Sequence, residues 1–149
     1  SYICVMDIDP KTAEMKIRRF VAIDDCGNII NPMIVTGQIH GGLAMGIAPA
    51  MYEELIYDDD GNILNGTFMD YLLPTSVETP NWETGHTITP SPHHPLGAKG
   101  VAESPTVGAP PAVANAVVDA LSHLGVTHVN IPVTPFKVWK ILKEKGVIS

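Results

Sequence analysis

The chain has 149 residues, of which 45% are hydrophobic and 17% charged, a length and composition that favour one globular domain. Its formal net charge of −7 argues against nucleic acid as a partner, because such binding needs a basic surface. Cys4 and Cys26 are too few for a disulfide framework and fit either a reducing cytoplasm or one incidental bridge. No apolar run is long enough to span a membrane. The sequence does not begin with Met, so we expect a processed start or a piece of a longer protein.

Two strands are predicted near the start of the chain, over residues 3–8 and 15–23. The residues Asp9-Pro10-Lys11-Thr12 form the turn that joins them. Another turn is predicted over residues 24–30, and Asn31-Pro32 is interpreted as a further break in regular structure.

A helix is predicted over about residues 37–55, because apolar residues recur there at every fourth position. Thr36 is its expected cap, and Pro49 should kink it or interrupt its hydrogen bonding. Each of its glycines weakens the helix by about 1 kcal/mol relative to Ala, so packing must hold it together.

The middle of the chain is predicted to be poor in regular structure. Residues 54–57 and 62–68 suggest a hairpin around Asp58-Asp59-Asp60-Gly61, a solvated turn that does not match a calcium loop. Residues 70–98 show little periodicity, with one short strand expected over about 86–89. A stretch this long without regular structure is usually functional or packs on a partner.

A second long helix is predicted over about residues 105–124, with Ser104-Pro105 at its start and Gly125 at its end. A strand over 126–131 and a last helix over about 135–145 complete the chain. This mixture of elements predicts an α+β fold.

The stretch GAKGVAESPTVGAPP places Lys99 and Glu103 among small residues just before the second long helix. Unpaired backbone N–H groups at a helix start favour an anion, and Lys99 adds a positive charge. Glu103 has two possible roles: it complements the helix dipole or forms a salt bridge, or it acts as a catalytic base. The stretch TGQIHGGLAMG has a similar composition, and its Gln38 either caps a helix or contacts a ligand. The histidines have no metal-ligand spacing, so we predict no metal held directly by protein side chains.

Both stretches resemble one family. GAKGVAES resembles the glutamate-bearing loop of the molybdenum hydroxylases, the xanthine oxidase and aldehyde oxidoreductase family, and TGQIHGGLAMGIAPAMYEE resembles the start of its glutamine-bearing helix. The resemblance covers nearly the whole chain. It implies that residues 1–149 form one partial molybdopterin-binding domain, the C-terminal part of the large, molybdenum-binding subunit.

The resemblance also implies roles for particular residues. Glu103 would be the active-site glutamate beside the molybdenum, and Gln38 would hydrogen-bond the pterin. Lys99, Gly100, Val101 and Ala102 would line the cofactor, molybdopterin cytosine dinucleotide. Electrons would pass to two [2Fe–2S] clusters on a small subunit and to FAD on a medium subunit.

Within the family, GAKGVAESPTVGAPPAVANAVVDAL and PVTPFKVWK most resemble the branch that oxidises carbon monoxide with water at a molybdenum–copper site. The copper-holding cysteine of that branch belongs to a part of the large subunit that this chain lacks, and neither Cys4 nor Cys26 matches its motif. We therefore expect the chain to be inactive without the remainder of the large subunit. The expected location is the cytoplasm or the inner face of the cell membrane. The alternatives are a molybdenum hydroxylase acting on an aldehyde or an N-heterocycle, and a non-catalytic domain that has lost its chemistry.

Overall fold

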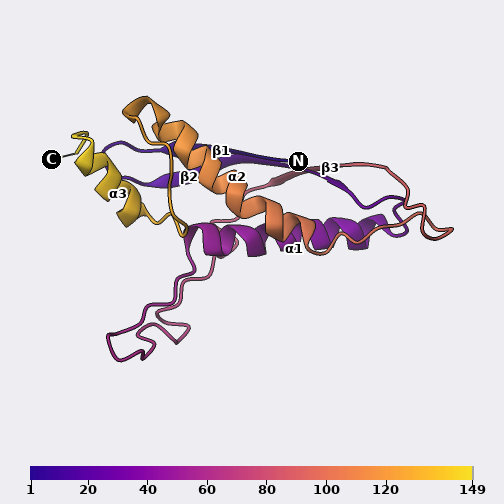
Figure 1. Cartoon of the computed structure of the whole chain (residues 1–149), viewed down its shortest axis with the longest axis horizontal. Helices are drawn as coiled ribbons and strands as arrows, with labels where there is room; N and C mark the ends of the chain where they lie inside the picture. The colour runs from indigo at the N-terminus through magenta and orange to yellow at the C-terminus, as the bar shows by residue number, and fades with distance from the viewer. Residues whose placement is uncertain (149) are drawn as a thin grey trace.

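The computed structural model describes residues 1–148 and confirms an α+β fold (Figure 1). Strands β1 and β2 pair antiparallel, and β3 adds to β2 in parallel, giving a sheet in the order β1-β2-β3. In chain order the elements are β1 (Tyr2–Ile8), β2 (Met15–Asp25), α1 (Pro32–Met51), β3 (Trp82–Thr87), α2 (Ser104–Leu121), the 3₁₀ helix η1 (Ser122–Leu124) and α3 (Pro135–Glu144).

Helices α1 and α2 lie side by side and run in the same direction (Figure 1). They touch through small residues: a Cβ atom built on Gly42 would lie 2.9 Å from Cβ of Pro105, and one built on Gly46 would lie 2.7 Å from Cβ of Ala109. The N-terminal ends of both helices therefore lie at the same end of the pair. Fully buried side chains from the sheet and both helices form one core, among them Phe20, Leu43, Ile47, Val113 and Val117.

The start of α1 differs from the prediction. The helix begins at Pro32, and the side-chain Oδ1 of Asn31 accepts a hydrogen bond from the backbone N–H of Ile34 at 3.2 Å. Asn at the cap followed by Pro in the first turn is a start signal, so interpreting this pair as a break was wrong. The predicted cap, Thr36, lies inside the helix, which ends at Met51 rather than at residue 55.

Asn31→Ala tests which residue caps α1. We expect it to lower the free energy of unfolding by about 1 kcal/mol, since it removes the acceptor for an N–H group that the helix leaves unpaired. The measurement is urea denaturation of this variant beside Thr36→Ala. Thr36→Ala should change the stability by only a few tenths of a kcal/mol. Equal losses in the two variants would contradict the structural assignment of the cap.

The remaining long elements agree with the sequence more closely. Strands β1 and β2, the helix predicted over 105–124 and the last helix are confirmed, and Gly125 ends η1 with a left-handed φ of 75°. The strand expected over 86–89 lies earlier in the chain: β3 ends at Thr87 and is paired along β2.

One predicted strand was wrong, and one predicted hairpin is shorter than expected. Residues 126–131 form no strand, although Val126 and Val129 are buried against the core. The hairpin predicted over 54–57 and 62–68 is present only around its turn, where Tyr57 and Ile63 form an antiparallel bridge. The backbone N–H of Leu64 donates to the carbonyl of Ile56 at 2.8 Å, and that of Asp58 donates to the carbonyl of Asn62 at 3.0 Å. Apolar residues predicted each segment, but a strand also needs a neighbour along its whole backbone.

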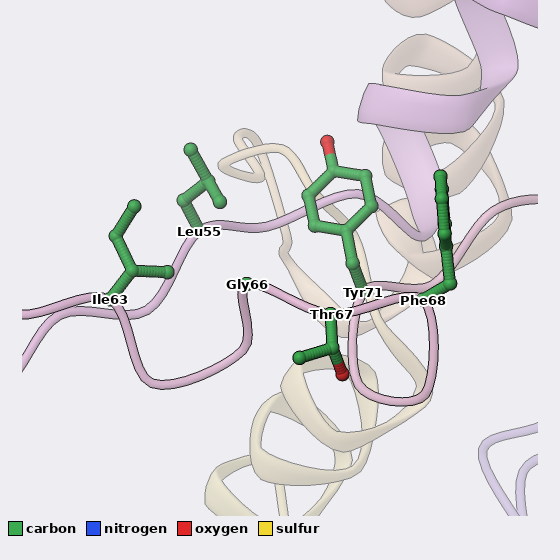
Figure 2. Close-up of a pocket in the computed structure, with 6 residues that line it drawn as sticks. All are labelled: Leu55, Ile63, Gly66, Thr67, Phe68 and Tyr71. Atoms are coloured by element: carbon green, nitrogen blue, oxygen red, sulfur yellow. The ribbon is translucent and has the colours of Figure 1, made fainter.

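Residues 53–81 form an excursion that leaves the helices and the sheet, called the arm below (Figure 1). Its apolar side chains are largely uncovered, and Phe68 and Met69 are each 91% exposed. A cavity of about 470 Å³ lies within it, lined by Leu55, Ile63, Gly66, Thr67, Phe68 and Tyr71 (Figure 2). The predicted solvated turn is present, since Oδ1 of Asp58 accepts a hydrogen bond from the backbone N–H of Asn62 at 2.8 Å.

Candidate active site

The segment over residues 97–103, called the Glu103 loop below, is joined at its start to the turn after β2. Ala98 forms a bridge with Gly27, and the backbone N–H of Asn28 donates to the carbonyl of Gly97 at 3.0 Å. A Cβ atom on Gly27 would lie 2.2 Å from that carbonyl oxygen, and both glycines have a left-handed φ. The position of Gly97 thus brings two segments of backbone together.

Lys99 is held by the end of β2. Its Nζ lies 2.8 Å from Oδ1 of Asp25, and its backbone N–H donates to the carbonyl of Cys26 at 2.7 Å. The Lys99 ammonium, helped by hydrogen bonds from Thr89 and from the Gly27 N–H, holds the pKa of the Asp25 carboxyl well below its usual range. The charge of Lys99 is therefore balanced within the chain, and its contact with a cofactor stays a prediction.

Glu103 directly precedes α2, and its side chain is exposed. Its carbonyl accepts a hydrogen bond from the N–H of Val107 at 3.0 Å, but across residues 1–148 its carboxylate has no hydrogen bond or ion pair. A salt bridge with Lys99 is thus not formed, because Lys99 pairs with Asp25. The carboxylate lies where the helix dipole favours negative charge, and it is open to an incoming group.

Gln38 lies in the second turn of α1 rather than at the predicted helix start, and its side chain is exposed. Its neighbours Gly37 and Gly41 face open space, since a Cβ atom built on either would meet no atom within 4 Å; the same holds for Gly100. Gln38 is about one turn before Gly42, which packs against α2. Because Gly42 packs against Pro105 at the start of α2, Gln38 and the Glu103 loop lie on the same side of this contact.

Sequence reasoning missed a buried polar cluster at the end of β2. Asp24 is only 5% exposed, and its Oδ1 accepts hydrogen bonds from the hydroxyl of Tyr2 and, at 2.6 Å, from that of Ser104. Burial and the bond to Asp24 raise the pKa of Tyr2 to about 12. The sequence held a signal: Asp24 follows the apolar Phe20 and Ala22 at a spacing of two, which places it on the buried face of the strand.

A cleft of about 260 Å³ separates the start of α1 from the Glu103 loop. It is lined by both segments and by the turn after β2: Cys26, Asn28, Ile29, Ile30, Asn31, Ile34, Val35, Ala98 and Lys99. Within residues 1–148, no group of three or more His, Cys, Asp or Glu side chains is arranged to hold a metal ion. In the same range, no helix is both long and apolar enough to cross a bilayer.

Known proteins match the chain over nearly its whole length. It is 63% identical over 146 residues to the carbon monoxide dehydrogenase large chain of Hydrogenophaga pseudoflava, and 43% identical over 145 residues to the nicotine 6-hydroxylase large subunit of Paenarthrobacter nicotinovorans. These matches cover 98% and 97% of this chain, but only 18% of each relative. A crystal structure of a Cu,Mo-CO dehydrogenase superposes with a TM-score of 0.94 at 54% identity, over 98% of this chain and 18% of that one.

A family model for the molybdopterin cofactor-binding domain matches residues 1–80, which include the β1–β2 pair, Gln38 and all of α1. The match agrees with the resemblance in the Gln38 stretch and with the superposition of the whole fold. The chain therefore belongs to the family of molybdopterin cofactor-binding domains.

Proposed function

We propose that this chain, as one partial domain, supplies part of the molybdenum site of an enzyme that oxidises carbon monoxide with water to CO2, two protons and two electrons. The observation that carries the proposal is the carboxylate of Glu103, unpartnered within residues 1–148 and on the same side of the Gly42–Pro105 contact as Gln38. The 63% identity to a carbon monoxide dehydrogenase large chain supports this substrate.

The residues present fit a molybdopterin cofactor. Gly37, Gly41 and Gly100 are exposed, and a Cβ atom built on any of them would meet no atom within 4 Å, so a bulky group can approach closely. The amide of Gln38 offers both a donor and an acceptor, as a pterin ring edge requires. The N-terminal ends of α1 and α2 favour anionic groups such as the phosphates of a dinucleotide.

Each predicted site residue then has a definite task. Gln38 binds and orients the pterin, while Lys99, Gly100, Val101 and Ala102 line the cofactor. Glu103 accepts a proton on a carboxylate oxygen as water is consumed, because nothing else in the described chain occupies that carboxylate. The molybdenum cofactor, when bound, supplies the two-electron oxidation.

The complete enzyme needs components beyond this chain. We propose that the cofactor is molybdopterin cytosine dinucleotide, with copper held by the remainder of the large subunit. The partners are a medium subunit that binds FAD and a small subunit that carries [2Fe–2S] clusters. The proposed location is the cytoplasm or the inner face of the cell membrane.

Elemental analysis of the enzyme purified from its native source tests the proposal. We expect about one molybdenum and one copper per large chain, and nucleotide analysis should find cytidine monophosphate after acid hydrolysis of the cofactor. Large chains without molybdenum, from cells grown with molybdate, would contradict the proposal.

A second candidate is hydroxylation of an N-heterocycle. The 43% identity to a nicotine 6-hydroxylase large subunit over 97% of this chain favours it. The same residues would serve, because the pterin contact and the proton acceptor do not depend on the substrate. Molybdenum without copper, with turnover of a heterocycle and none of carbon monoxide, would select this candidate.

A further inference from the structure

Asp24 and Asp25, at the end of β2, bind one residue before Glu103 and one residue after it in the sequence. Asp25 binds the ammonium of Lys99, four residues before Glu103, with 2.8 Å between Nζ and Oδ1. Asp24 binds the hydroxyl of Ser104, the residue after Glu103, at 2.6 Å. The catalytic glutamate thus lies between two anchored side chains.

The Asp25 anchor is built from several contacts. Asp25 pairs with Thr87 across the β2–β3 ladder, and its Oδ2 accepts the hydroxyl of Thr87 at 3.1 Å. Its Oδ1 accepts the backbone N–H groups of Gly27 at 2.9 Å and Thr89 at 3.1 Å. These bonds fix the Asp25 carboxylate in place without Lys99. Forming the ion pair therefore costs little further conformational entropy of the Asp25 side chain.

The Asp24 anchor is buried. Oδ1 accepts both hydroxyl groups of the cluster, while Oδ2 has no hydrogen-bond partner among residues 1–148. A buried carboxyl oxygen without a partner destabilises a fold. The stability of the fold therefore does not explain why an aspartate occupies this buried position. The hydrogen bond from Ser104, the first residue of α2, gives Asp24 a role in holding the start of that helix.

Between the anchors the loop has two further hydrogen bonds: the carbonyl of Glu103 accepts the N–H of Val107 at 3.0 Å, and the carbonyl of Val101 accepts the hydroxyl of Ser104 at 3.4 Å. Glu103 has no side-chain hydrogen bond within the described chain, and a Cβ atom on Gly100 would meet no atom within 4 Å. Only Val101 packs against the core. The position of the Glu103 carboxylate thus depends on how the two ends of the loop are held.

We propose that Asp24 and Asp25 are positioning residues, which set the place of Glu103 relative to the molybdenum cofactor by anchoring Ser104 and Lys99. This inference rests on the proposed function, because it concerns the same site. Neither aspartate needs to touch substrate or cofactor. A displacement of the base by about 1 Å is enough to reduce turnover by about a hundredfold.

The test uses the assembled enzyme with two variants and two matched controls. Asp25→Asn removes the charge that binds Lys99, and Ser104→Ala removes the hydroxyl that binds Asp24. Asp24 itself is left in place, because a change at this buried site could prevent folding. Asp7→Asn is the control for the loss of a charge, because Asp7, on β1, forms an exposed ion pair with Arg18 at 3.3 Å. Ser104→Thr is the control for Ser104→Ala, because it keeps the hydroxyl.

The first readout is hydrogen exchange over residues 97–103, which needs no turnover. We expect exchange at least ten times faster in Asp25→Asn and Ser104→Ala, and unchanged in the two controls. The backbone N–H of Lys99, now bonded to the carbonyl of Cys26, should report the change directly. Exchange at the wild-type rate in both variants would overturn the proposal.

The second readout is the kcat and KM of each enzyme with its molybdenum content. We expect kcat to fall by about ten- to a hundredfold in the two variants, with molybdenum and KM retained. If Asp25→Asn and Ser104→Ala exchange faster but keep the wild-type kcat, the two aspartates hold the loop but do not position Glu103 for catalysis, and the proposal is overturned. If Glu103→Gln also keeps wild-type kcat, the failure lies in the proposed function rather than in the anchors.

Discussion

Glu103→Gln is expected to lower turnover of the assembled enzyme by about 10²–10⁴-fold, the usual contribution of a general base. The substitution keeps the size and shape of the side chain but removes its ability to accept a proton. Molybdenum content should not change, since the carboxylate makes no contact that holds the Glu103 loop in place. The measurement is kcat with carbon monoxide, beside metal analysis of the same preparation.

Glu144→Gln is the matched control, because Glu144 is an exposed carboxylate at the end of α3. It should leave kcat at the wild-type value. If Glu103→Gln also leaves kcat unchanged, Glu103 takes no part in the chemistry, and the alternative of a non-catalytic domain gains support.

Gly46→Leu is expected to lower the free energy of unfolding by at least about 2 kcal/mol, because it overfills a tight helix contact. Even a single Cβ atom at Gly46 would lie 2.7 Å from Cβ of Ala109. Ala109 belongs to α2, and its Cβ atom cannot move away unless the helix itself shifts. Helices α1 and α2 would have to separate, which exposes part of the core that both cover. Urea denaturation of the 149-residue chain measures the loss as a lower midpoint.

Gly41→Leu makes the same change on the same helix at an open position, where a Cβ atom meets nothing within 4 Å. It should stabilise the chain by roughly 0.8 kcal/mol, since Leu is the better helix former. Similar losses in the two variants would mean that the contact between α1 and α2 is not as close as the structure shows.

The sequence predicted helices more reliably than strands, for a physical reason. A helix satisfies its backbone within one segment, so the apolar spacing of α2 and α3 was sufficient to place them. A strand needs a partner from elsewhere, and residues 126–131 have suitable side chains but no ladder. The start of α1 was a different error, because Asn31-Pro32 was interpreted as a break when its residue types also specify a cap.

The candidate site was only partly accessible from the sequence. The small residues around Gln38 and Glu103 indicated two ligand-contacting stretches, and the parallel packing of α1 and α2 places both at one end. The partners of the loop were not predictable from local spacing: Ser104 and Asp24 are separated by 80 positions, and their bond depends on how β2 and α2 pack. Roles at a molybdenum site came from the family resemblance rather than from spacing.

The composition of the arm has a consequence for proteolysis. The apolar side chains of the arm are largely exposed, yet no Lys or Arg occurs between Arg19 and Lys99. Trypsin, which cuts after basic residues, therefore has no site in a segment that chymotrypsin would cut readily at Phe68. The first tryptic site beyond Arg19 is Lys99 itself, held by Asp25. Cleavage there by trypsin reports the release of the Glu103 loop, without interference from the arm.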